Sequence, residues 1–131
     1  MTIYALSSGP GLAGVAVIRV SGPETKKVLK NITFLPLPEP KFASLRKFKD
    51  PETKDLIDEG ILLWFPGPQS YTGEDMAELH VHGSKAVIDA IHKSISKIDG
   101  CRLADPGEFT KIAFQNGKIN LLKAESIADL I

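Results

Sequence analysis

The sequence predicts an α/β fold of the α+β type, a sheet with flanking helices, on the basis of three observations. Segments rich in strand-forming residues are interspersed with segments of helical spacing along the 131 residues. The 43% hydrophobic content allows one globular domain of this length to bury about two-thirds of its unfolded surface. From Ala77 to His82 apolar and polar residues alternate, which is typical of a strand with one face on the core.

Four strands and one helix are expected in the first half of the chain. Ser21-Gly22-Pro23-Glu24 starts the helix, with the proline in its first turn. The third and fourth strands form a hairpin around the turn Asp50–Asp55. The four strands are predicted at Thr2–Leu6, Val15–Val20, Ala43–Phe48 and Leu56–Phe65.

The second half continues with the alternating strand and a helix from Ser84 to Ile98, for which Ser84 is a good N-cap. His92 falls beside the apolar stripe of this helix, so we expect it on the helix surface rather than as a ligand. A short strand follows at Cys101–Ala104. The last complete helix runs from Phe109 to Gln115, and Asn116-Gly117 suits a left-handed cap.

Composition excludes several classes of protein. Lys and Arg total 16, as do Asp and Glu, so the formal net charge is zero and a main nucleic-acid surface is not expected. The single cysteine, Cys101, excludes an intrachain disulfide and a cluster of zinc-binding cysteines, and is expected to be a small strand residue. No apolar run reaches the ~20 residues of a membrane helix.

Two glycine motifs do not meet the requirements of nucleotide binding. Gly9-Pro10-Gly11-Leu12-Ala13-Gly14 matches the dinucleotide fingerprint, but a strand and not a helix follows it, so a glycine turn between strands is the better interpretation. Asn116-Gly117-Lys118 lacks the earlier glycine of a phosphate loop and the Ser or Thr after the lysine. No Ser or Cys lies in a nucleophile elbow, so the sequence offers no candidate for covalent catalysis.

One face of the alternating strand carries Glu78, His80 and His82, because residues two apart point the same way. Two imidazoles at this spacing could bind zinc, and a zinc hydrolase is one interpretation. A catalytic zinc also needs a third ligand and a base, for which the chain offers only scattered carboxylates and His92. Polar groups hydrogen-bonded on a sheet face are therefore the favoured interpretation of His80 and His82.

Two cations are oddly placed for purely structural residues. Arg19 interrupts an apolar strand, where a permanently charged guanidinium either meets an anion or reaches solvent or a structural carboxylate. Lys118 directly follows the helix cap, which suits an anion site, although an ordinary solvated lysine is the alternative. With Glu78, these residues outline a ligand site of one carboxylate and two cations.

Four motifs follow one another along the chain: TIYALSSGPGLAGVAVIRVSGP, LWFPGPQSYTGEDMAELHVHG, DPGEFTKIAFQNGKIN and KAESIADLI. Together they closely resemble the N-terminal domain of the MnmE (TrmE) family of tRNA modification GTPases. The resemblance covers almost the whole chain and is weakest from Lys30 to Asp55, and TIYALSSG and ELHVHG look closer to mitochondrial members than to typical bacterial ones. It implies a mixed sheet similar to the tetrahydrofolate-binding domain of the glycine cleavage T-protein.

The resemblance also implies a function. Residues 1–120 would bind 5-formyl- or methylene-tetrahydrofolate as a one-carbon donor and form a homodimer. Residues 121–131 would begin a helical domain, which a complete protein follows with a potassium-dependent GTPase domain that binds GTP and magnesium. With a flavin-dependent partner of the MnmG type, such a protein modifies carbon 5 of the tRNA wobble uridine, in the bacterial cytoplasm or, for a eukaryotic member, in the mitochondrial matrix.

Carried over by position, the folate contacts of the family fall on Arg19, Glu78 and Lys118. A carboxylate could accept the amino and ring N–H groups of the pterin, and either cation could bind the glutamyl tail. No residue of this segment is expected to be catalytic. The alternatives are a dimerisation scaffold in which the three residues are structural, and the zinc hydrolase that uses His80 and His82.

Overall fold

The computed structural model describes residues 1–8 and 14–120, and these form six strands and three helices. The turn predicted at Gly9–Gly14, except for Gly14, and the terminal helix predicted from Leu121 lie outside the described residues. The strands are β1 (Thr2–Leu6), β2 (Val15–Ser21), β3 (Ser44–Lys49), β4 (Leu56–Phe65), β5 (Met76–His82) and β6 (Cys101–Leu103). The helices are α1 (Thr25–Thr33), α2 (Lys85–Ser96) and α3 (Glu108–Gln115).

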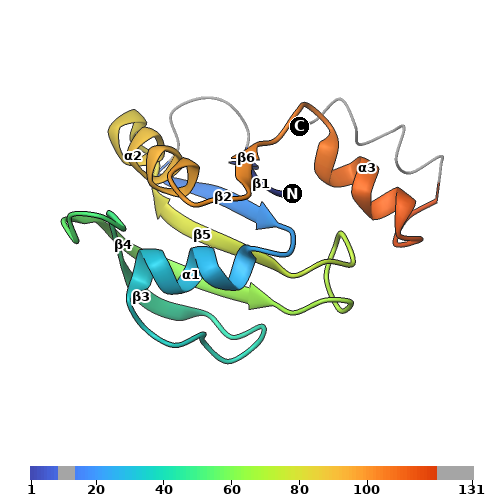
Figure 1. Cartoon of the computed structure of the whole chain (residues 1–131), viewed down its shortest axis with the longest axis horizontal. Helices are drawn as coiled ribbons and strands as arrows, with labels where there is room; N and C mark the ends of the chain where they lie inside the picture. The colour runs from blue at the N-terminus through green and yellow to red at the C-terminus, as the bar shows by residue number, and fades with distance from the viewer. Residues whose placement is uncertain (9–13, 121–131) are drawn as a thin grey trace.

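The six strands form one mixed sheet in the order β3-β4-β5-β2-β1-β6 (Figure 1). All neighbours pair antiparallel except β1 and β6, which are parallel. β2 and β5 lie at the centre, although Ser21 and Met76 are 55 positions apart in the chain and α1 and a hairpin lie between them. The α/β class and the hairpin predicted from the sequence are confirmed.

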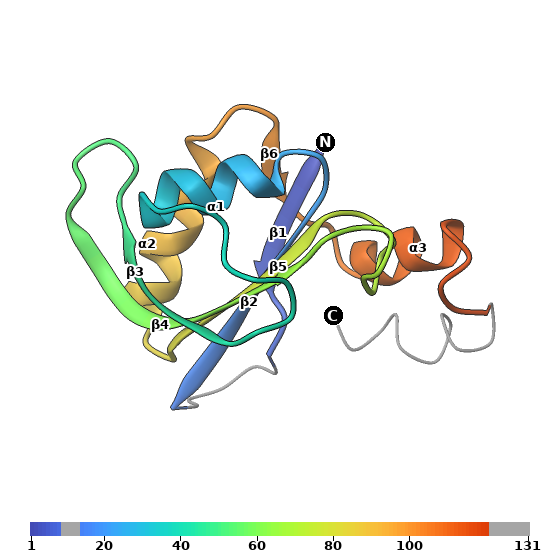
Figure 2. The same ribbon diagram turned by 90° about the horizontal axis from the view of Figure 1, so that it is seen from below.

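One face of the sheet packs against α1 and α2, which lie on the same side of it (Figure 2). Ile18 of β2 and Leu79 of β5 are completely buried in this core, together with Ile32 of α1 and Ile91 of α2. Because side chains alternate along a strand, burial of Leu79 and its neighbours at positions i±2 turns Glu78, His80 and His82 to the opposite face. The shared polar face predicted for β5 is therefore confirmed.

The opposite face is covered at one end only. There, Phe109 of α3 is buried against Ile3 and Met76, and forms a second, smaller core cluster. Farther along the same face Val15 and Leu45 keep 56% and 63% of their surface exposed, which is unusual for apolar residues in a sheet. The polar face of β5 thus lies between a covered end and an open apolar surface.

Three sequence predictions differ from the structure at the ends of helices. Pro23 lies in a turn before α1 and not in its first turn, because the Glu24 N–H bonds to the Thr2 hydroxyl at 2.6 Å and holds the turn open. α3 begins one residue early, at Glu108. At its end Asn116 has a φ of −91°, and only Gly117, at 72°, adopts the left-handed conformation.

The expectation for His92 was wrong. The imidazole is half-buried beside the ring of Tyr4, with 5.4 Å between the ring centroids, and is not on the helix surface. Burial lowers the pKa of His92 below its usual value. The neighbouring Cys101 is a half-buried strand residue, as expected, and burial raises the pKa of its thiol.

Candidate ligand site on the open sheet face

Arg19 and Glu78 form the centre of the site. They are directly opposite each other in the β2–β5 pair, and Arg19 Nη2 lies 3.4 Å from Glu78 Oε2. Both side chains are about three-quarters buried, at 24% and 21% exposure. The structure therefore brings together two of the three residues predicted from the sequence. A carboxylate partner for Arg19 was one of the environments that the sequence left open, and the structure shows one in Glu78.

His80 binds the second oxygen of the same carboxylate. Its Nε2 lies 3.0 Å from Glu78 Oε1, so Glu78 is held from both sides by nitrogen donors. A carboxylate offers about four lone-pair positions to donors, and these two contacts leave about half of them free. Glu78 can therefore still accept hydrogen bonds from a ligand.

The guanidinium of Arg19 also lies close to two aromatic rings. Its central carbon is 5.3 Å from the ring centroid of Tyr71 and 5.7 Å from that of Phe109. Its Nε is buried and has no acceptor within the described residues. A buried donor without a partner is costly, so a ligand that supplied an acceptor would relieve that cost.

Lys118 lies at the edge of this region rather than in contact with Glu78. Its backbone N–H bonds to Ala113 O at 2.8 Å, which anchors it at the end of α3. A Cβ added to Gly73 would lie 3.2 Å from Lys118 Cε, so the lysine stem passes along the loop that carries Tyr71. The side chain is exposed, and no described carboxylate pairs with it.

The loop between β4 and β5 connects the two cations. Tyr71 contacts Arg19, and its hydroxyl lies 3.2 Å from that of Thr110 on α3. The amide of Asn116 donates to Thr72 O at 2.7 Å, which ties the same loop to the end of α3. Arg19 and Lys118 thus both lie next to one anchored loop.

His82 is bound to a different carboxylate from His80. Its Nδ1 and its backbone N–H each lie 2.8 Å from an oxygen of Asp58 on β4. Burial acts to raise the pKa of Asp58, but the hydrogen bonds from His82 outweigh it and lower that pKa below its usual value. The described residues contain no group of three side chains placed to hold a metal ion, and the two imidazoles do not converge on one point.

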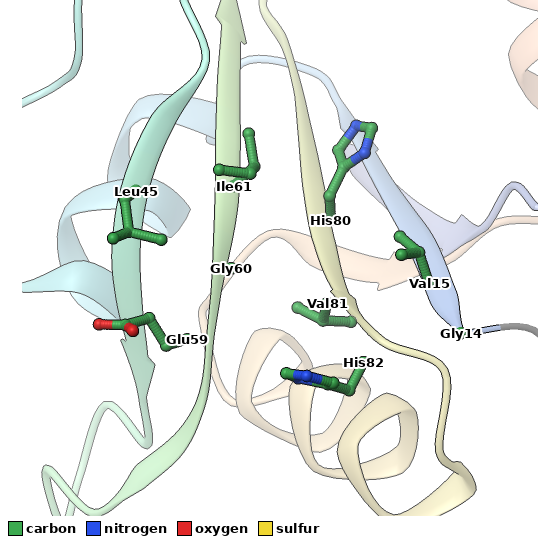
Figure 3. A pocket seen from close by; sticks show the side chains of 9 residues that line it. All are labelled: Gly14, Val15, Leu45, Glu59, Gly60, Ile61, His80, Val81 and His82. Atoms are coloured by element: carbon green, nitrogen blue, oxygen red, sulfur yellow. The ribbon is translucent and has the colours of Figure 1, made fainter.

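A hollow of about 320 Å³ adjoins the site on the open face, between β2, β5, β4 and β3 (Figure 3). Its lining includes His80, His82 and Glu59 together with apolar side chains such as Leu45. Arg19 and Glu78 do not line it, so His80 is the residue that both lines the hollow and binds Glu78. Gly60 is also among its lining residues, and a Cβ added at this position would lie 2.0 Å from His80 O.

Sequence reasoning missed four contributors to this surface: Tyr71, Phe109, Asp58 and Gly60. An isolated glycine in an apolar strand is a sign of close backbone approach, so Gly60 could have been found. Nothing in the local sequence indicates that Asp58 binds His82, 24 positions later, or that Tyr71 and Phe109 meet at Arg19.

Known proteins are similar to this chain over nearly its whole length. The family described as "GTP-binding protein TrmE N-terminus" matches residues 2–118. That range contains every element of the sheet and all three predicted site residues. Within the described residues, no helix is long and apolar enough to cross a membrane.

The chain is also similar to longer, named proteins. It is 74% identical over its full length to "tRNA modification GTPase MnmE" of Pelagibacter ubique, of which it covers 30%. It is 50% identical, over 99% of its length, to "5-taurinomethyluridine-[tRNA] synthase subunit GTPB3, mitochondrial" of Danio rerio and of Homo sapiens, and covers 26% and 27% of them. The chain spans less than a third of these relatives, and it belongs to the family of TrmE N-terminal domains.

Proposed function

We propose that this chain is the folate-binding and dimerisation domain of a protein that modifies the wobble uridine of tRNA. Its named relatives are tRNA modification GTPases and subunits of a tRNA-modifying synthase, which supports the tRNA substrate. The folate, as 5-formyl- or methylene-tetrahydrofolate, supplies the one-carbon unit. GTP, magnesium and potassium bind elsewhere in the complete protein, and a flavin-dependent protein of the MnmG type is its partner.

The pairing of Arg19 with Glu78 is the observation that carries the proposal. Glu78 has free acceptor positions, and Arg19 Nε–H is a buried donor without a described partner. A pterin ring presents an amino group, a ring N–H and a carbonyl, so it supplies donors to the first and an acceptor to the second. The donor and acceptor pattern of the site fits the ligand class.

Lys118 completes the site as the cation for the glutamyl tail. Arg19 is already neutralised by Glu78, whereas no described carboxylate pairs with Lys118. A dianionic tail gains most from a cation that has no other anion to satisfy. This assigns the pterin to Arg19 and Glu78 and the tail to Lys118, next to the same Tyr71 loop.

Calorimetric titration with 5-formyltetrahydrofolate tests this assignment. Glu78→Ala should abolish saturable binding, and Lys118→Ala should weaken it by about tenfold, the value of one charge-assisted hydrogen bond. Glu52→Ala and Lys111→Ala are matched controls, because both side chains are exposed and neither has a described contact with Arg19 or Glu78. Binding to Glu78→Ala as tight as to the parent chain would refute the folate site.

Dimerisation through the open sheet face is the second part of the proposal. The rival function is a pure scaffold, which dimerises in the same way but binds no ligand. The exposed apolar side chains of Val15 and Leu45 favour burial against another surface. Sedimentation with and without folate separates the two functions, because a pure scaffold dimerises to the same extent in both. Charged substitution at Leu45 should shift the chain toward monomer in either case.

The compartment follows from the source of the protein. Bacterial relatives carry the MnmE name and the vertebrate relatives are named mitochondrial. We place the protein in the bacterial cytoplasm, or in the mitochondrial matrix for a eukaryotic source. Imaging of a tagged full-length protein in the source organism tests this placement.

A further inference from the structure

We infer that His80 is a positioning residue for Glu78, which holds this carboxylate in the direction that ligand binding requires. The inference rests on the proposed function, since the ligand is the one that Glu78 would bind. It starts from a fixed geometric relationship, the 3.0 Å separation of His80 Nε2 and Glu78 Oε1. The two residues are two positions apart on one face of β5, so their backbones keep them together.

The contact fixes where the proton of the imidazole lies. An ionised carboxylate is only an acceptor, so His80 Nε2 must carry a hydrogen and donate it to Glu78. In the neutral ring, Nδ1 is then the atom without a proton. His80 therefore holds Glu78 Oε1 while Arg19 holds Oε2, and the remaining lone pairs of the carboxylate are fixed in direction.

Other polar groups near His80 must be separated from this effect. Arg19 lies opposite Glu78 on β2 and stays charged at all relevant pH values. Glu59 of β4 lines the same hollow, and His82 projects from the same face of β5. His82 is bound to Asp58, not to Glu78, and so it is a matched control imidazole.

Titration of the parent, His80→Gln, His80→Phe and His82→Gln chains with 5-formyltetrahydrofolate tests the inference. His80→Phe removes the donor and should weaken binding roughly tenfold. Gln can donate from nearly the same position as Nε2, so His80→Gln should bind nearly as tightly as the parent. His82→Gln should also bind like the parent, because His82 is bound to Asp58 and not to Glu78.

The inference is overturned if His80→Phe binds like the parent, or if His80→Gln binds as weakly as His80→Phe. A second readout needs no ligand: nitrogen-15 NMR of the free parent chain at pH 8 should show the His80 proton on Nε2. A proton on Nδ1 instead would overturn the positioning of Glu78. Absence of binding by the parent would overturn the proposed function, and the tautomer would still decide the positioning of Glu78.

Discussion

Arg19 and Glu78 lie opposite each other in the two central strands, with 3.4 Å between Nη2 and Oε2. The pair is antiparallel and its side chains project from the face that α1 and α2 leave uncovered. A cross-strand ion pair of this kind both stabilises the register of β2 with β5 and presents a fixed carboxylate at the surface. If the proposed ligand binds here, stability and ligand recognition depend on the same two side chains.

A double-mutant cycle on this pair should show modest coupling. Arg19→Gln and Glu78→Gln together should destabilise the chain less than the sum of the single changes, by about 1 kcal/mol, because the pair is only partly buried and solvent screens it. Urea unfolding of the four chains measures the difference. The exposed pair Lys85–Asp89, with 3.1 Å between its charged atoms, is the control and should couple by less than about 0.5 kcal/mol. Equal coupling in both pairs would contradict the prediction.

Substitution of Gly60 should be among the most damaging single changes in the sheet. In Gly60→Ala the new Cβ would lie 2.0 Å from His80 O, and backbone atoms of two paired strands cannot move apart without breaking the ladder. We expect a loss of about 3 kcal/mol or more in the free energy of unfolding. Thermal and urea unfolding provide the measurement.

Gly14→Ala is the matched control for this change. An added Cβ at Gly14 meets no atom of the described residues within 4 Å, apart from its chain neighbours, so the free energy of unfolding should change by less than about 0.5 kcal/mol. Similar effects of the two substitutions would show that the close approach of β4 and β5 at Gly60 is not what requires glycine there.

The sequence predicted the elements better than the contacts between them. The sequence predicts β4 at Leu56–Phe65, as observed, because the turn Asp50–Asp55 precedes it and the run Ile61–Phe65 is strongly apolar. The alternation in β5 correctly placed Glu78 with His80 on one face, since side-chain direction is a local property of a strand. Such features depend on residues close together in the chain.

The partners of those side chains depend on topology, which spacing does not encode. His80 binds Glu78 within its own strand, whereas His82 binds Asp58 of β4. The pairing of β4 with β5 brings Asp58 to His82 and not to His80, and the sequence of neither strand indicates that pairing. The zinc interpretation treated the two imidazoles as equivalent, and the structure shows that their environments differ.

Acid should destabilise the chain through Asp50. This carboxylate accepts the backbone N–H groups of Thr53 and Glu52 and a hydrogen bond from Lys97, and these contacts lower the pKa of Asp50 to about 2. Its stabilising contribution is fully present above the unfolded pKa of about 3.9, and is lost as the pH falls through the folded value. Asp50→Asn should therefore flatten the stability profile between about pH 4 and 2.

Urea unfolding of the parent and Asp50→Asn chains across that range measures the effect. Asp55→Asn, in the same turn, is the control and should retain the steeper acid dependence of the parent, because the Lys97 contact stays intact. An unchanged profile in Asp50→Asn would assign the acid sensitivity to other carboxylates, such as Asp58.

Protonation of His92 should destabilise the chain in a higher pH range than protonation of Asp50. Protonation removes a hydrogen-bonded charge at Asp50, whereas at His92 it creates a charge in a half-buried position. Its imidazole is half-buried beside Tyr4, its Nε2 has no partner within the described residues, and burial lowers the pKa of the ring. The unfolded chain takes up the proton first, so stability is full above about pH 6.5 and falls as the pH decreases toward the folded pKa. His92→Phe keeps the ring contact but cannot be protonated, and so it should remove this decline between about pH 7 and 5, as measured by thermal unfolding. His82→Phe, at an exposed imidazole, should leave the decline in place. A decline of the same size in the parent and in His92→Phe would show that the buried ring does not govern stability in this range.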